Sequence, residues 1–184
     1  MFDLLLEEDF LDLASREAIL SELRTAGAQP AVVYGQQAGG AVDTRVRSTK
    51  RLVVAAQTRA LVISRLMERK TSIAAHFGVE LNVCEEPQFL RYQAGDFFVA
   101  HQDGNTPLIL DASRLRKISV IVFLSAPDTY EGGSLVFHGK YPDADIRQTL
   151  RAHAGSLVAF RSETTHEVTP VIRGERYSIA SWYR

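Results

Sequence analysis

The sequence contains almost no cysteine, no excess of charge of one sign and no long hydrophobic run. Cys84 is the only cysteine among 184 residues, so no disulfide can form within the chain, which is typical of a reducing cytoplasm. With 21 basic and 22 acidic residues, the chain lacks the positive charge of a dedicated nucleic-acid-binding protein. No stretch approaches the roughly 18 consecutive apolar residues of a membrane span. These absences predict a cytoplasmic protein without a nucleic-acid or membrane partner.

The length of 184 residues and the 46% share of apolar residues are typical of one ordinary globular domain. We therefore expect a single domain over residues 1–184. Within it, residues 1–85 have a helical character and form a support region, whereas residues 86–184 have the character of a β-rich core.

Two helices are expected in the first region. Ser15 is suited to cap a helix that ends near Gly27. Apolar residues at intervals near 3.6 predict a longer helix over about 55–77, which Gly78 closes. Residues 34–40 are rich in glycine but lack the Gly-Lys-Ser/Thr ending of a P-loop, so we expect a surface loop there.

Short β-branched and aromatic runs separated by turn residues fill the second region, and their spacing favours an antiparallel sandwich or barrel over βαβ units. The predicted strands are Gln88–Tyr92, Phe97–His101, Ile118–Leu124, Ser134–Phe137, Ser156–Phe160 and Tyr177–Tyr183. Two long polar connections, 102–116 and 138–150, are of a length that is more often functional than idle.

The candidate chemistry starts at His101 and Asp103. Two residues apart at a strand end, an imidazole and a carboxylate can reach the same metal ion. Such a pair is common by chance, but His166 adds a second histidine directly after another predicted strand. Two histidines and one carboxylate are the ligand set of the facial triad of non-haem iron enzymes. Arg176 and Ser178 share one face of the last strand, and together they are suited to hold a carboxylate of an organic acid.

With these residues in place, the sequence resembles the iron(II)- and 2-oxoglutarate-dependent dioxygenases, in particular their prolyl 4-hydroxylase-like branch. The resemblance extends from about residue 89 to 184 and more loosely over the first half. The matching blocks, in order, are Leu90-Arg91-Tyr92, His101-x-Asp103, Val122-Phe123-Leu124, Glu131-Gly132-Gly133-Ser134-Leu135, Ala154–Phe160, His166-x-Val168-x-Pro170-Val171 and Arg176-x-Ser178 with Trp182.

The resemblance implies a mainly β fold of the α+β type: a double-stranded β-helix, or cupin-like jelly roll, with the N-terminal helices packed outside it. It also implies a role for each matching residue. The iron ligands would be His101, Asp103 and His166. The residues that bind 2-oxoglutarate would be Arg176, Ser178 and Tyr92. Phe123 departs from the pattern, because some relatives have a second tyrosine there, and one hydroxyl donor to the co-substrate is thereby lost.

By the same resemblance the protein is a hydroxylase that uses Fe(II), 2-oxoglutarate and O2, with ascorbate as a reductant. Succinate and CO2 would be co-products of the hydroxylation of an unactivated C–H bond. A prolyl residue in a peptide or protein is the first candidate substrate, and a free amino acid or small metabolite is the alternative. Arg161 and Arg116 are candidates for substrate contacts. The oligomeric state cannot be read from the sequence.

Other interpretations of the same residues exist. Two histidines and an aspartate also describe a catalytic zinc site, but a zinc hydrolase has no general need for the arginine and serine pair. A non-catalytic jelly-roll binding module would be expected to have lost a ligand. His76, His138 and His153 are expected to be structural or loop residues. The pair Gly132-Gly133 is expected to form a turn with positive φ, and Trp182 is expected in the core rather than in a cavity wall.

Overall fold

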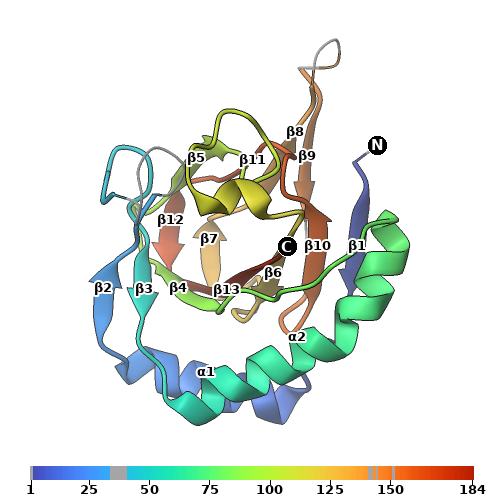
Figure 1. Ribbon diagram of the computed structural model, residues 1–184. Helices are drawn as coiled ribbons and strands as arrows, with labels where there is room; N and C mark the ends of the chain where they lie inside the picture. Colours follow the sequence, from blue (N-terminus) through green and yellow to red (C-terminus); the bar gives the residue numbers. More distant parts are fainter. Residues whose placement is uncertain (1, 34–40, 141–142, 144, 151) are drawn as a thin grey trace.

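The computed structural model describes residues 2–33, 41–140, 143, 145–150 and 152–184. Two helices and thirteen strands are found in this part of the chain (Figure 1). The helices are α1 (Leu13–Thr25) and α2 (Ala56–Phe77), and a short 3₁₀ helix covers Ala112–Leu115. The expected surface loop at 34–40 lies outside the described residues.

Three antiparallel sheets make up the β structure. The large sheet has the order β1 (Leu4–Glu7), β10 (Leu157–Arg161), β6 (Ile118–Phe123), β13 (Arg176–Tyr183), β4 (Gln88–Tyr92), β3 (Lys50–Leu52) and β2 (Ala28–Pro30). The small sheet has the order β5 (Phe98–His101), β11 (His166–Val168), β8 (Leu135–His138) and β9 (Arg147–Leu150). The third is a two-stranded antiparallel pair of β12 (Val171–Gly174) and β7 (Tyr130–Gly132).

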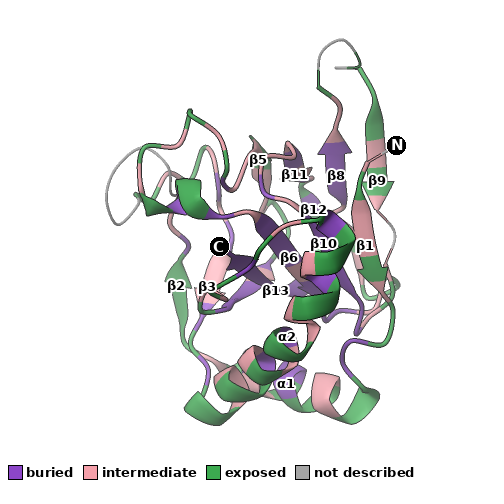
Figure 2. Ribbon diagram, turned by 45° about the vertical axis from the view of Figure 1, so that its right-hand side comes forward, coloured by how far each residue is buried: buried purple, intermediate pink, exposed green. Residues whose placement is uncertain are grey.

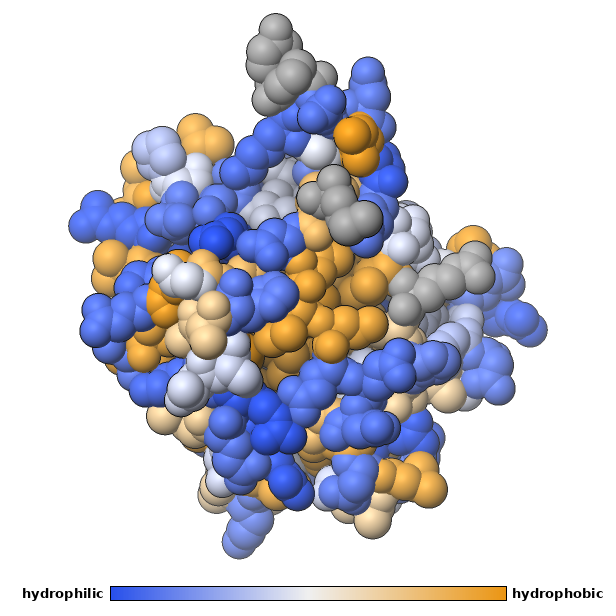
Figure 3. Space-filling model, turned by 90° about the vertical axis from the view of Figure 1, so that its right-hand side faces the viewer, coloured by the Kyte–Doolittle hydropathy of each residue, from blue (hydrophilic) through white to orange (hydrophobic). Residues whose placement is uncertain are grey.

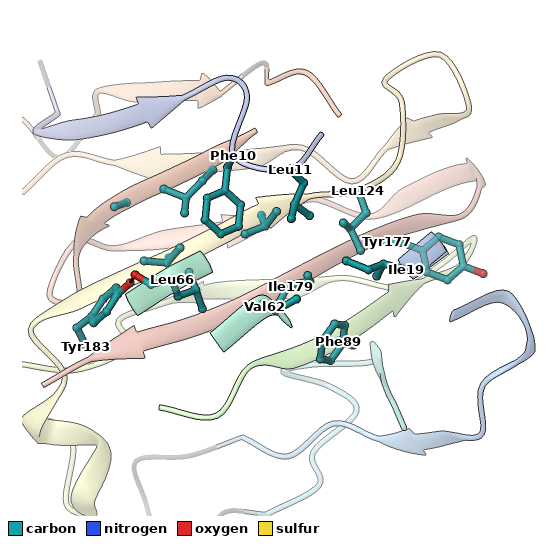
Figure 4. Close-up of a cluster of buried hydrophobic side chains, with 14 of the residues drawn as sticks. Phe10, Leu11, Ile19, Val62, Leu66, Phe89, Leu124, Tyr177, Ile179 and Tyr183 are labelled. Atoms are coloured by element: carbon teal, nitrogen blue, oxygen red, sulfur yellow. Dashed lines mark hydrogen bonds between the residues drawn. The ribbon is translucent and has the colours of Figure 1, made fainter. Parts of the chain in front are cut away.

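Both helices lie against one face of the large sheet, and their apolar stripes form a core with it. Figure 4 shows Ile19 of α1 and Val62 and Leu66 of α2 facing Phe89 and Ile179 of the sheet. The alternation of side chains along β13 explains the arrangement, since odd-numbered residues such as Ile179 face the helices and even-numbered ones face the small sheet. The inner strands β8 and β13 are buried, whereas α1 and α2 expose their outer faces (Figure 2).

A second apolar cluster fills the space between the large and small sheets, and it includes Phe137, Phe160 and Val168. A mainly β jelly-roll core with helices outside is therefore confirmed.

The side of the molecule that carries β1 shows hydrophobic side chains gathered in its middle (Figure 3). On this side β1 is the edge of the large sheet, and its Leu6 is 42% exposed. Among the described helices, none is long and apolar enough to cross a membrane.

The structure corrects the sequence predictions at three places. The cap of α1 is Asp12, whose carboxylate accepts the Ser15 amide at 2.8 Å; the predicted cap Ser15 lies inside the helix, because an aspartate three residues earlier satisfies the free amide. Residues 1–85 are not only helical, since β1, β2 and β3 join the large sheet. The connection 138–150 contains β9, which pairs with β8.

The other helix predictions and the Gly132-Gly133 turn are confirmed. Gly78 ends α2 with φ 62°, and both glycines of the turn have positive φ. Cys84 is partly buried, and this burial raises the pKa of its thiol, as expected for an unreactive cysteine.

Candidate active site

His101, Asp103 and His166 meet at one end of the small sheet. His101 is the last residue of β5 and His166 the first of β11, and these two residues lie opposite each other in the antiparallel pair. Asp103 follows two residues after β5. One ligand atom from each of the three side chains lies within 4.8 Å of the others. Among the residues that the structure describes, this is the group with the composition and spacing of a metal site.

A β-bulge aims His101 at this point. Three residues of β11, His166 to Val168, lie opposite four residues of β5, Phe98 to His101. The extra residue brings Phe98 and His101 to the same face, where their rings stack with centroids 3.5 Å apart and planes at 14°. Each histidine has its Nδ1 close to a backbone carbonyl oxygen: Val99 at 2.7 Å for His101 and Thr164 at 2.9 Å for His166. A carbonyl only accepts, so Nδ1 carries the proton and Nε2 is left free as a ligand.

The protonation states also suit a metal. The pKa of His166 is lowered to about 4, first by burial, which disfavours the charged ring, and then by repulsion from His101. Burial alone would raise the pKa of Asp103, but attraction by the protonated forms of His166 and His101 holds it well below its usual range. At neutral pH the site therefore offers a neutral imidazole from His166 and an ionised carboxylate from Asp103, which are the forms that coordinate a metal.

Arg176 is the most unusual buried group near this site. It is only 2% exposed, yet no carboxylate in the described part of the chain lies within salt-bridge distance of its guanidinium. Its Nη1 donates to Ser178 Oγ at 3.0 Å, and its Nε is buried without a hydrogen-bond partner among the described residues. The rings of Tyr92 and Phe123 lie 5.2 and 5.5 Å from the guanidinium carbon. A buried cation in this state is costly unless an anion joins it.

The three candidate ligands and Arg176 line the same cavity between the two main sheets. The cavity measures about 90 Å³, whereas a single water needs roughly 10–15 Å³, so a small organic molecule has room there. Tyr92, the β-pair partner of Arg176, and Ser178 also line it. Trp182 is buried but lines the cavity as well, which corrects the expectation that it belongs to the core alone.

The two predicted substrate contacts lie in different places. Arg116 lines the cavity, is 6% exposed, stacks on the Trp182 ring at 3.7 Å and forms a two-pronged ion pair with Glu85. The structure does not bring Arg161 to the cavity wall. Because β10 alternates, Arg161 points to the helix side of the sheet, where its Nη2 donates to the Phe77 carbonyl at 2.8 Å.

The other histidines discussed above lie away from this cavity. His76 lies in α2 with its Nε2 3.2 Å from Asp3 Oδ1. His138 ends β8, and its Nε2 lies 3.1 Å from Glu167 Oε1. His153 lies in the connection between β9 and β10.

Comparison with known proteins places the chain. Residues 87–184 match the 2OG-Fe(II) oxygenase superfamily. The chain belongs to this superfamily. It is 32% identical over 154 residues to a PKHD-type hydroxylase of Shewanella sp. (strain ANA-3), and the match covers 82% of this chain. A PKHD-type hydroxylase of Burkholderia ambifaria is 39% identical over 97 residues, covering 52% of this chain and 41% of the relative. The chain covers 66% of the length of the Shewanella relative.

Solved structures of the superfamily share the fold. A Pseudomonas putida prolyl-4-hydroxylase superposes with a TM-score of 0.76 at 21% identity, covering 100% of this chain and 93% of that chain. A Trichoplax adhaerens prolyl hydroxylase, solved in complex with a hypoxia inducible factor peptide fragment, gives 0.69 at 19% identity, covering 98% and 83%. At these identities the comparison supports the jelly-roll architecture and leaves the chemistry to be argued from the residues.

The residues of the cavity fit the ligands that the 2OG-Fe(II) oxygenase superfamily uses. Fe(II) prefers a facial set of two imidazoles and one carboxylate, which is the set that His101, His166 and Asp103 present. A dicarboxylate such as 2-oxoglutarate carries the anion that the buried guanidinium of Arg176 lacks in the described part of the chain. Tyr92 and Ser178 line the same region.

Several site residues were missed by the sequence reasoning. The Ser119 hydroxyl donates to the Asp103 carboxylate, and the Ser162 carbonyl accepts the Asp103 amide. Arg47 lines the cavity, with its guanidinium carbon 4.8 Å from the centre of the Phe98 ring. Gly133 lies so close to Arg176 that an added Cβ would be 3.0 Å from its Cδ. For Ser119 a signal existed in the sequence, since a serine interrupts an otherwise apolar β run. The contacts of the other three depend on chain segments far apart in the sequence.

Proposed function

We propose that this protein is an Fe(II)- and 2-oxoglutarate-dependent dioxygenase that hydroxylates a prolyl residue in a peptide or protein. This reaction type is supported by one observation: the cavity contains both the His101, Asp103 and His166 group and the buried Arg176, which has no acidic partner among the described residues. The balanced reaction converts 2-oxoglutarate, O2 and R–H to succinate, CO2 and R–OH. In this superfamily the bound iron and co-substrate supply the oxidant.

The protein's own residues do the binding and orientation. His101, His166 and Asp103 would hold the iron from one side and leave the opposite side open. Arg176, assisted by Ser178, would bind the far carboxylate of 2-oxoglutarate through charge-assisted hydrogen bonds. Tyr92 would add a contact to the co-substrate. The apolar walls from Leu90, Ile121, Leu135, Val168 and Ala180 keep bulk water away from the reacting atoms.

The prolyl substrate is supported by the relatives. The superposable Pseudomonas putida and Trichoplax adhaerens proteins are prolyl hydroxylases, and the second was solved with a peptide. In this chain Arg116 and the Trp182 ring line the cavity, and we assign them to the substrate side. Arg161 would serve a substrate only through a segment that reaches outside the cavity.

Mass spectrometry of candidate substrates tests this assignment. The purified protein is incubated with Fe(II), 2-oxoglutarate, ascorbate and a library of proline-containing peptides, with matched peptides in which alanine replaces proline and with free L-proline as controls. We expect a gain of about 16 Da, one oxygen atom, on proline peptides only. Oxidation of free L-proline but of no peptide would support a small-molecule hydroxylase and contradict the prolyl-peptide assignment.

A further inference from the structure

The carboxylate of Asp103 is held by a serine that comes from the opposite sheet. Ser119 lies in β6 of the large sheet, and its exposed fraction is 0%. Its Oγ donates to Asp103 Oδ2 at 2.8 Å. The same Oγ lies 3.0 Å from the Oγ of Ser162, which follows β10 and is also 0% exposed. Two fully buried hydroxyls are therefore arranged in line behind the carboxylate.

The direction of this chain of hydrogen bonds follows from proton counting. A hydroxyl carries a single proton, and an ionised carboxylate only accepts. Since the proton of Ser119 goes to Asp103, the Ser162 hydroxyl must donate to Ser119. Hydrogen bonds in such a chain polarise and strengthen one another. The Ser162 carbonyl also accepts the amides of Asp103 and Gly104 at 2.8 and 3.1 Å, so Ser162 fixes both the backbone and the side chain of this loop.

Asp103 needs this support more than the two histidines do. His101 and His166 belong to paired strands, and each has its ring fixed by a carbonyl. Asp103 lies beyond the end of β5, so no strand pairing fixes its side chain. Ser119 bonds Oδ2, which lies 3.5 Å from His166 Nε2, and this fixes the plane of the carboxylate so that Oδ1 lies 3.6 Å from His101 Nε2.

We propose that Ser119, supported by Ser162, is a positioning residue for the metal site, which holds the Asp103 carboxylate in the orientation that binds the metal beside His101 and His166. The proposal rests on the iron-dependent function proposed above, and it adds a residue that touches neither the metal nor the substrates. Removing a partner that orients a metal ligand typically lowers metal affinity by roughly 10- to 100-fold.

Metal binding without turnover tests the proposal. Mn(II) is titrated into the metal-free protein, and the free ion is followed by its electron paramagnetic resonance signal. For Ser119→Ala we expect the Mn(II) dissociation constant to rise at least roughly 10-fold, and for Ser162→Ala a smaller rise, because Ser119 can still donate. Ser156→Ala is the matched control: Ser156 is also 0% exposed, and its Oγ donates to the Glu8 carbonyl instead. Its Mn(II) affinity should equal that of the wild type.

A second measurement separates positioning from folding. Thermal melts identify the folded variants, and raising the Fe(II) concentration should recover most of the succinate-forming rate of Ser119→Ala. A folded Ser119→Ala protein with wild-type Mn(II) affinity would overturn the positioning role alone. If Ser119→Ala does not fold, an unchanged affinity in Ser162→Ala would overturn it instead. If the wild type itself binds no Mn(II), both the positioning role and the proposed iron-dependent function fail.

Discussion

Replacing Arg176 by methionine separates a binding role from a structural one, because the two roles predict opposite effects on stability. Arg176 is 2% exposed, and no acidic partner lies within salt-bridge distance in the described part of the chain. Exchanging such a buried charge for an apolar side chain of similar length is usually neutral or stabilising. We therefore expect the melting temperature of the protein without 2-oxoglutarate to stay the same or to rise.

The affinity for 2-oxoglutarate should change in the other direction. The variant leaves a co-substrate carboxylate buried without its charged partner, which costs about 2–4 kcal/mol. At about 1.4 kcal/mol per tenfold change, this corresponds to an increase of about 30- to 700-fold in the dissociation constant. The assay is calorimetric titration of 2-oxoglutarate into the Mn(II)-loaded protein, with the apparent requirement for succinate formation as a second readout.

Arg173→Met serves as the control for Arg176→Met. Arg173 lies in β12 with its side chain 81% exposed and a 3.7 Å contact to Glu131, so neither the affinity nor the melting temperature should change appreciably. Unchanged 2-oxoglutarate affinity in Arg176→Met, combined with a large loss of stability, would refute the reasoning and show that Arg176 is a structural residue.

Two further predictions concern the surroundings of the site. Gly133→Ala should raise the 2-oxoglutarate requirement roughly 10-fold, because the new Cβ would lie 3.0 Å from Arg176 Cδ and 2.9 Å from Val171 Cγ2. The control is Gly78→Ala, which has a similar φ and open space around it and should lose stability only. The same 2-oxoglutarate requirement in both variants would contradict the idea that an added Cβ at residue 133 displaces Arg176. Burial alone would raise the pKa of Glu85, but Arg116 and Arg184 hold it below its ordinary value of 4.5. The ion pairs of Glu85 therefore stabilise the fold fully above pH 4.5, and this stabilisation is lost as the pH falls through the lowered pKa. In urea unfolding, the free energy of unfolding of the wild type should exceed that of Glu85→Gln by about 2 kcal/mol at pH 7, and this difference should shrink as the pH falls through the lowered pKa of Glu85; a difference independent of pH would contradict this.

The sequence was informative where a local pattern determines the structure. The spacing of His101 and Asp103, the face shared by Arg176 and Ser178, and the apolar period that ends at Gly78 each depend on neighbours within a few residues, and all three are found as expected. Asp12 rather than Ser15 caps α1 because both residue types are good caps and only the backbone geometry decides between them.

What the sequence could not predict depends on long-range pairing. The short strand β1 pairs with β10, about 150 residues away, and its four residues carry no alternating pattern of their own. The bulge that stacks Phe98 on His101 exists only in the pairing with β11. Arg161 was placed near the site by its position in the sequence, but the alternation of β10 turns it toward α2.

The most direct test of the central claim is O2-dependent formation of succinate from 2-oxoglutarate by the Fe(II)-loaded protein, compared with His166→Ala. His166 is buried and contributes one of the three metal ligands of the proposed site. We expect slow succinate formation by the wild type even without the substrate that is hydroxylated. No succinate should form without O2 or with the folded His166→Ala variant. Succinate formation by His166→Ala at the wild-type rate would contradict the assignment of the iron site.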